Sequence, residues 1–257
     1  MFEGPEEALK ETKNTQPAIV SMSLILTKLL EAKGVKPDYV AGHSVGEYAA
    51  FGAAGYLSTE DTVKLTSARG KFMNDTAVKV NGGMAAIIGL DSEKIKEVLT
   101  NVEGIVEAVN FNEPNQTVIA GQKDAIERAC IALKEAGARR AMPLAVSGPF
   151  HSSLMKEAGE KLKEEAEKYT FQMTDVKLVA NTTADTLNSI EDIKNEIYAQ
   201  SFGPVKWVDT VKKLKSEGVT KIYEIGLVKY WRGIVKKIDK EIEIKNIEKL
   251  EDLENLM

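Results

Sequence analysis

Residues 42–47 read Gly42-His43-Ser44-Val45-Gly46-Glu47, after a short apolar run and before a stretch of small residues. This is the G-x-S-x-G pattern in the order strand, sharp turn, helix, which exposes a serine hydroxyl above a sheet. Because such a turn brings the strand and helix backbones close together, we expect a Cβ at Gly42 or Gly46 to collide. The pattern also arises by chance in turns, but this context predicts that Ser44 is a nucleophile.

The composition is that of an ordinary globular protein with a proper core. The chain has 257 residues, of which 43% are hydrophobic and 28% charged, within the usual range. The net charge is -5, so no basic excess is available to neutralise the phosphates of a nucleic acid. We therefore expect small molecules or proteins as partners, and no nucleic acid.

Cysteine and histidine are scarce. Cys130 is the only cysteine, so the chain can form no internal disulfide, and a reducing compartment is expected. Two histidines and one cysteine far apart in sequence do not make metal-ligand spacing, so no metal site is predicted. The first residues lack a signal-peptide pattern and no apolar stretch is long enough to span a bilayer. A cytoplasmic protein without membrane contact is the expectation.

The chain alternates helices and strands in the manner of an α/β protein. A helix is expected from Pro17 to Gly34, then the strand into the serine turn, then a helix from Ser58 to about Asn74. Later segments predict helices at 190–200 and 204–217, strands at 176–180 and 221–225, and a charged, mostly helical remainder. The helix ahead of the strand at 176 is expected to end near Tyr169.

The middle of the chain has an order of its own. Strands are expected at 84–89, 105–111, 116–121 and 139–146, with helices at 92–100 and 123–136. This is βαββαβ, the order of a ferredoxin-like unit. We assign it to residues 82–147, inserted between residues 1–81 and 148–257 of one discontinuous domain.

A nucleophilic serine needs a base, and the chain offers two histidines. His43 precedes Ser44 at the end of a strand, where adjacent side chains point to opposite faces. It is therefore not expected to reach the Ser44 hydroxyl. His151 lies in a Gly-Pro turn ahead of a helix, where catalytic groups collect, although a lone loop histidine is more often a surface residue. Given the nucleophile, His151 is the predicted base.

Several stretches together resemble one family. They are Gly42-His43-Ser44-Val45-Gly46-Glu47, Arg69-Gly70, Asn110-Phe111-Asn112 with Val118-Ile119-Ala120-Gly121, and Phe150-His151-Ser152-Ser153-Leu154-Met155. In order and spacing the chain resembles the malonyl-CoA:acyl carrier protein transacylases over nearly its whole length. The resemblance implies a hydrolase-like α/β core with a parallel sheet and an inserted ferredoxin-like βαββαβ subdomain.

The resemblance also implies a reaction. Ser44, activated by His151, would take a malonyl group from malonyl-CoA and pass it to the phosphopantetheine thiol of acyl carrier protein. This serves fatty acid or polyketide synthesis, and the enzyme itself needs no cofactor because the partner carries the phosphopantetheine. In this family a main-chain carbonyl orients the histidine, and the matching position here is Gln200.

Further site residues follow from the same resemblance. The planar guanidinium of Arg69 would bind the malonyl carboxylate through two hydrogen bonds and so discriminate against acetyl groups. Phe150 resembles the malonyl-type signature. Asn110 and Asn112 match a stretch beside the cleft, although they read equally well as turn residues.

The sequence departs from the family in two places. The family begins with a strand and a Gly-Gln-Gly-Ser-Gln turn that supplies one oxyanion N–H; no such segment is present, which leaves only the Val45 N–H. An empty sheet position is therefore expected, and a fragment, a truncated product and a compensated variant all fit. The second departure is 226–233, where Tyr230 and Trp231 replace small residues; they cover exposed surface or are ordinary variation.

Two other functions fit parts of the pattern. A serine hydrolase or thioesterase would use the same turn, but it would normally use an acid to orient the histidine and gives no role to Arg69. A catalytically silent relative would bind the carrier protein without forming acyl-Ser44. Carrier proteins are acidic, so a basic docking face is expected. Candidates are Lys71, Arg139, Arg140, Lys236 and Lys237, each of which also fits a solvated surface charge.

Overall fold

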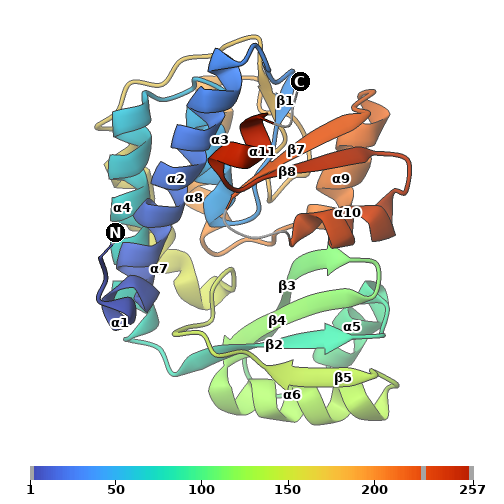
Figure 1. The fold of residues 1–257 in the computed structure, drawn as a ribbon. Helices are drawn as coiled ribbons and strands as arrows, with labels where there is room; N and C mark the ends of the chain where they lie inside the picture. The colour runs from blue at the N-terminus through green and yellow to red at the C-terminus, as the bar shows by residue number, and fades with distance from the viewer. Residues whose placement is uncertain (1–2, 227–229, 255–257) are drawn as a thin grey trace.

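The computed structural model describes residues 3–226 and 230–254. Figure 1 shows a helix-rich part that contains both ends of the chain, and beside it a four-stranded sheet with helices on one face. In the helix-rich part the helices are α1 Glu6–Lys10, α2 Thr12–Ala32, α3 Val45–Ala53, α4 Thr59–Ala77, α7 Lys156–Ala166, α8 Ile190–Gln200, α9 Trp207–Ser216, α10 Trp231–Ile238 and α11 Leu250–Glu254, with a 3₁₀ turn at Ser153–Met155. Its strands are β1 Tyr39–Val40, β6 Lys177–Leu178, β7 Lys221–Ile225 and β8 Glu243–Ile247.

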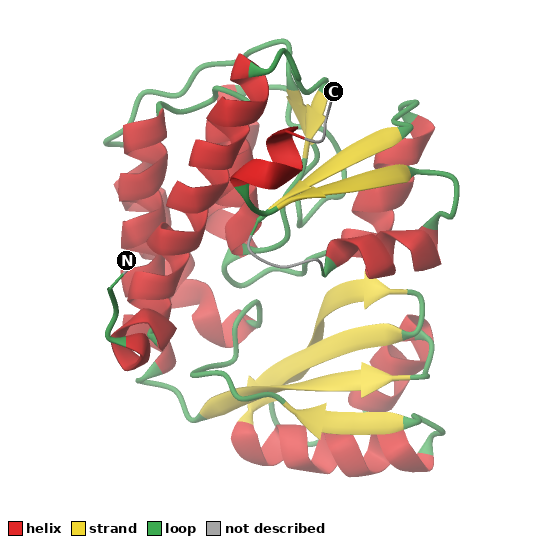
Figure 2. Ribbon diagram, viewed as in Figure 1, coloured by secondary structure: helices red, strands yellow, loops and turns green. Residues whose placement is uncertain are grey.

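The strands of this part run parallel, as Figure 2 shows. Val40 of β1 lies opposite Leu178 of β6, and β7 pairs with β8. Across the described ranges these are two separate two-stranded sheets. Helices pack around β1 and β6 with a core that includes Leu24, Phe51, Leu65, Leu162, Leu178 and Ile193. This core fixes the end of β1, where the serine turn begins.

The middle segment forms a sheet with helices packed on one face. Its elements are β2 Gly82–Ile88, α5 Ser92–Leu99, β3 Val106–Glu113, β4 Gln116–Gln122, α6 Lys123–Glu135 and β5 Arg140–Pro143. The sheet order is β3-β4-β2-β5, with every neighbouring pair antiparallel. The helices bury Ile95, Ala129 and Leu133 against the sheet. This is the βαββαβ order that the sequence predicts, whereas the domain boundaries at 82 and 147 stay a prediction.

Two elements differ from the sequence prediction. The prediction of a mostly helical end is wrong for β8, which pairs with β7 and buries Ile244 and Ile247. Helix α2 begins at Thr12, earlier than the predicted start at Pro17, and Pro17 lies inside it. The early start matters for function, because the first turns of α2 lie beside Ser44.

Within residues 3–226 and 230–254, no helix combines the length and the apolar character needed to cross a bilayer.

Candidate active site

The serine turn has the geometry of a strained elbow. Ser44 follows β1 and precedes α3 with φ 54° and ψ −114°, a backbone conformation that side-chain-bearing residues rarely adopt. A Cβ on Gly42 would lie 2.0 Å from the carbonyl carbon of Gly46, whereas a Cβ on Gly46 would meet nothing within 4 Å. The expected collision is therefore confirmed at Gly42 and wrong at Gly46. The role of Gly46 is that its backbone lies against Gly42.

We expect Gly42→Ala to lower the free energy of unfolding by about 3 kcal/mol, because the added methyl group displaces backbone rather than a flexible side chain. Chemical denaturation measures the change. Gly233→Ala, at an exposed position of α10, is the control; nothing lies within 4 Å of its added Cβ, and its backbone is that of an ordinary helix residue. A Gly42→Ala variant as stable as the parent would contradict the close approach.

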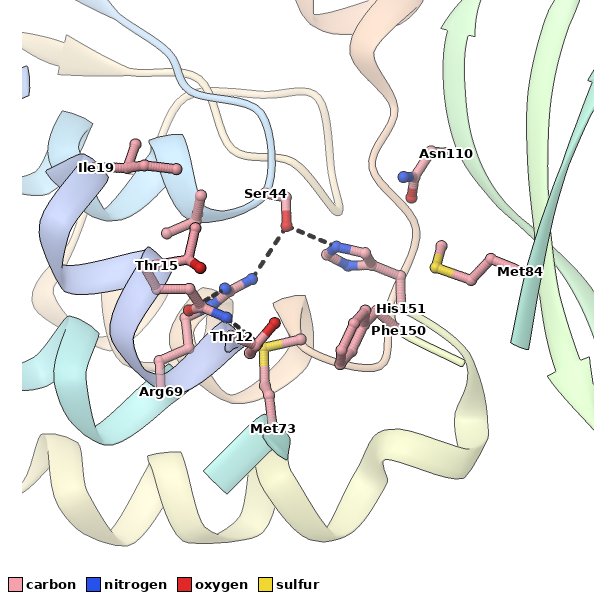
Figure 3. Close-up of a pocket in the computed structure, with 12 residues that line it drawn as sticks. Thr12, Thr15, Ile19, Ser44, Arg69, Met73, Met84, Asn110, Phe150 and His151 are labelled. Carbon is pink, nitrogen blue, oxygen red and sulfur yellow. Dashed lines mark hydrogen bonds between the residues drawn. The ribbon is translucent and has the colours of Figure 1, made fainter. Parts of the chain in front are cut away.

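Ser44 and His151 lie in hydrogen-bond contact. The distance from Ser44 Oγ to His151 Nε2 is 2.8 Å, and the distance from His151 Nδ1 to the main-chain oxygen of Gln200 is also 2.8 Å, as Figure 3 shows for Ser44 and His151. A carbonyl oxygen only accepts, so Nδ1 carries the proton and Nε2 accepts from the serine hydroxyl. The histidine is therefore oriented as a base.

The surroundings keep His151 uncharged. Its side chain is buried, and burial, followed by the nearby charge of Arg69, lowers the pKa of the imidazole to about 3. An imidazole with this pKa is neutral at pH 7. It can therefore take the proton of the serine hydroxyl.

Arg69 is a buried cation aimed at the serine. It is 1% exposed and donates from Nη1 to Gln16 Oε1 at 2.6 Å, and from Nη2 to Gln200 Oε1 at 2.8 Å and Ser44 Oγ at 3.2 Å. Its Nε is buried without a partner. Burial lowers the pKa of the guanidinium. In the part of the chain that the structure describes, no carboxylate forms an ion pair with it, so an anionic ligand would find a cation with free hydrogen-bonding capacity.

A cavity of about 250 Å³ opens beside these groups. The predicted residues Asn110 and Phe150 line it, and the Asn110 Oδ1 is buried without a partner. Val45 begins α3 behind Ser44 and also lines the cavity. The remaining lining residues are Thr12, Thr15, Gln16, Ile19, Met73 and Met84. Figure 3 shows how the side chains of α2 and α4 surround the serine.

Asn112 does not line this cavity; its side chain contacts His43 instead. The distance from His43 Nε2 to Asn112 Oδ1 is 2.8 Å, and the His43 ring lies 4.5 Å from that of Trp231 and 5.6 Å from that of Trp207. Burial lowers the pKa of His43 to about 4. As expected, His43 does not bond to Ser44, and Trp231 covers its imidazole. Within the second departure from the family, Leu227-Val228-Lys229 lie outside the described residues.

The proposed docking charges are partly engaged within the chain. Lys237 pairs with Glu113, with Nζ to Oε2 2.7 Å, and Lys236 Nζ donates to the main-chain oxygen of Lys240. The docking face stays a prediction. Over residues 3–226 and 230–254, no three histidine, cysteine, aspartate or glutamate side chains gather as a metal ion would require.

Sequence reasoning missed Gln16, Glu47 and Asn181 as parts of this site. Asn181 Oδ1 accepts from the Ser44 N–H at 2.7 Å, and its Nδ2 donates to the Gly42 oxygen at 2.6 Å. Asn181 follows β6, which pairs with β1. Its position after a parallel strand is the feature of the sequence that could have identified it. Its side chain holds both sides of the elbow.

A serine on such an elbow, a neutral histidine and a buried guanidinium define a serine acyltransferase. The acyl transferase domain family matches residues 1–226. The chain belongs to the malonyl CoA-acyl carrier protein transacylases, which confirms the family predicted from the sequence. The transacylase of Bacillus subtilis (strain 168) is 43% identical over 246 residues, covering 95% of this chain and 78% of that protein.

Solved structures of transacylases have the same fold as this chain. An acyl carrier protein S-malonyltransferase from Vibrio cholerae superposes with a TM-score of 0.95 at 37% identity, covering 99% of this chain and 84% of that one. A malonyl-transacylase solved in complex with a type II polyketide acyl carrier protein also gives a TM-score of 0.95, at 38% identity, covering 98% of this chain and 83% of that one.

Proposed function

We propose that this chain transfers a malonyl group from malonyl-CoA to the phosphopantetheine thiol of acyl carrier protein, through a malonyl-Ser44 intermediate, in fatty acid or polyketide synthesis. The observation that carries the proposal is that Ser44 Oγ contacts both a neutral base and a buried guanidinium, His151 at 2.8 Å and Arg69 at 3.2 Å. The base serves any acyl transfer, whereas the cation favours an acyl group that carries a carboxylate.

The first half-reaction forms the acyl-enzyme. His151 Nε2 takes the hydroxyl proton as Ser44 Oγ attacks the thioester carbonyl carbon, and the negative charge on the carbonyl oxygen faces the Val45 N–H. That N–H is the first of α3 and has no partner in the described ranges. His151 returns the proton to the sulfur as the carbon–sulfur bond breaks, so CoA leaves as a thiol.

The second half-reaction runs the same steps in reverse order. His151 takes the proton of the phosphopantetheine thiol, the sulfur attacks the malonyl ester, and Ser44 regains its proton. The Gln200 carbonyl keeps the Nδ1 proton in place through both halves. The enzyme itself supplies no cofactor in this scheme, because the carrier protein brings the phosphopantetheine.

The test separates transfer from its alternatives. The chain is exposed briefly to malonyl-CoA, its intact mass is measured, and holo acyl carrier protein is then added. A malonyl adduct that moves to the carrier supports the proposal. An adduct lost to water without transfer indicates a hydrolase, and carrier binding without any adduct indicates a silent relative.

We expect Arg69→Ala to lower the rate of malonyl-Ser44 formation on the order of 100-fold, because the buried substrate carboxylate loses its partner. The rate with acetyl-CoA, which has no carboxylate, should change much less. Timed intact-mass measurements with each thioester give both rates. Arg128→Ala removes an exposed arginine that pairs with Asp124 and should change neither rate. Equal losses for both acyl groups would contradict the carboxylate-binding role of Arg69.

A further inference from the structure

The Gln200 side chain joins the groups beneath the serine. Its Nε2 donates to the Ser44 main-chain oxygen at 2.7 Å and to Glu47 Oε2 at 2.8 Å. Its Oε1 accepts from Arg69 Nη2 at 2.8 Å. Gln200 is 1% exposed, so water cannot replace these partners. The family resemblance implies a role for this residue through its main-chain oxygen only.

The orientation of this amide decides how Arg69 is held. If the amide turned over, its NH₂ group would face the guanidinium, which only donates, and its oxygen would face the Ser44 carbonyl, which only accepts. Both contacts would be lost in a buried place, where unmatched polar groups are costly. The acceptors on the Nε2 side therefore keep Oε1 directed at Arg69.

Glu47 is the side-chain acceptor on that side, and it is itself fixed. It is 0% exposed, and its Oε1 accepts from the Asn181 N–H at 2.8 Å. The carboxyl group of Glu196 lies near enough for its charge to act on Glu47. Two buried carboxyl groups in this relation oppose each other's ionisation.

Burial disfavours the charged forms of both carboxyl groups and raises the pKa of each. Glu196 accepts from the Thr182 N–H at 3.0 Å and from the Thr182 hydroxyl, contacts that suit an ionised carboxylate. Burial, followed by the charge of Glu196, raises the pKa of Glu47 well above its usual range. The oxygens of Glu47 accept from the Asn181 N–H and from Gln200 Nε2.

We propose that Glu47 is a positioning residue: by accepting from Gln200 Nε2 it holds the Gln200 amide with Oε1 towards Arg69 and so supports the preference for malonyl over acetyl groups. This inference rests on the proposed function. Besides the Ser44 hydroxyl, Arg69 donates to two side-chain amides, those of Gln16 and Gln200. Without Glu47 only the Ser44 main-chain oxygen remains as an acceptor for Gln200 Nε2, so the amide is held less firmly and one arm of the guanidinium loses part of its support.

The test compares two substitutions of the same size change. Glu47→Met removes the side-chain acceptor of Gln200 Nε2. Glu196→Met removes the other carboxyl of the pair but leaves Glu47, which still accepts from Gln200. Each variant is measured for the ratio of malonyl to acetyl kcat/KM in Ser44 acylation, by timed intact mass, and for thermal unfolding.

We expect Glu47→Met to lower the malonyl-to-acetyl ratio about tenfold or more, mainly through a higher KM for malonyl-CoA. Glu196→Met should keep the ratio within about threefold of the parent. A Glu47→Met variant with the parent ratio overturns the inference, and so do equal losses in the two variants, which would indicate only a shared structural role.

A second substitution decides the question if Glu47→Met does not fold. Gln200→Met removes the amide but keeps the main-chain oxygen that His151 uses, so it should lower the same ratio; an unchanged ratio overturns the inference. A parent chain that forms no malonyl adduct would instead overturn the proposed function, so the two failures are distinguishable.

Discussion

Ser44→Ala abolishes acyl-enzyme formation: after exposure to malonyl-CoA, we expect the intact mass of the variant to remain that of the unmodified chain. The hydroxyl of Ser44 is the group whose oxygen lies 2.8 Å from the neutral His151 Nε2. Without it no covalent bond to the substrate can form at the elbow. Transfer to acyl carrier protein should fall roughly 10⁴-fold or more, measured from the accumulation of malonyl carrier protein.

The loss should come from chemistry and not from folding. Alanine removes two hydrogen bonds of Ser44 Oγ, the one to His151 Nε2 and the 3.2 Å bond from Arg69, and adds no bulk, so the variant should still fold and unfold cooperatively. Ser67→Ala, on an exposed position of α4, is the control and should acylate at the parent rate. A malonyl adduct on Ser44→Ala would show that another side chain is the nucleophile.

The central groups of the site could be found from the sequence because each depends on a local rule. The elbow has a residue pattern of its own, and with only two histidines the base followed from the geometry of a strand, which turns His43 away from Ser44. Arg69 and Gln200 needed the family resemblance, since nothing local distinguishes a buried arginine in a helix from a solvated one. The structure brings all four predicted residues, Ser44, Arg69, His151 and Gln200, into one hydrogen-bonded group, in which Gln200 contributes its side chain as well as the predicted main-chain oxygen.

The supporting network could not be found in this way. No local rule marks Glu47, the last residue of the serine motif, or Glu196 as a buried acid, and only the packing of α3 and α8 buries both carboxyl groups. Gln16 reads as part of a polar N-terminal stretch, because Pro17 suggested that the helix starts after it. These contacts join residues far apart in sequence, so their energy is set by tertiary packing.

The missed strand β8 has a different reason. The alternation of Ile242 and Ile244 with charged residues was a strand signal, but the segment is short and rich in lysine and glutamate, which also favour helices. Pairing with β7 decides the outcome, and Ile244 and Ile247 become buried. Here a nonlocal partner overrides an ambiguous local preference.

His151→Ala should lower the rate of Ser44 acylation roughly 10³-fold, within the range typical for the loss of a general base. The pH dependence of the parent is the sharper expectation. Burial and the charge of Arg69 lower the pKa of His151 to about 3, and only the neutral imidazole can accept the serine proton. The acylation rate should therefore stay flat as the pH falls from about 8 to about 5, and decline only as the pH approaches the lowered pKa.

The other histidine provides the matched control for that profile. His43 is also buried with a lowered pKa, but it bonds to Asn112 and not to Ser44. His43→Gln should keep the flat profile and lose far less activity than His151→Ala. A parent profile with its midpoint near 6.5, the usual pKa of histidine, would contradict the neutral, buried base. It would mean that His151 exchanges protons with solvent freely, and that the guanidinium of Arg69 does not act on it during acylation.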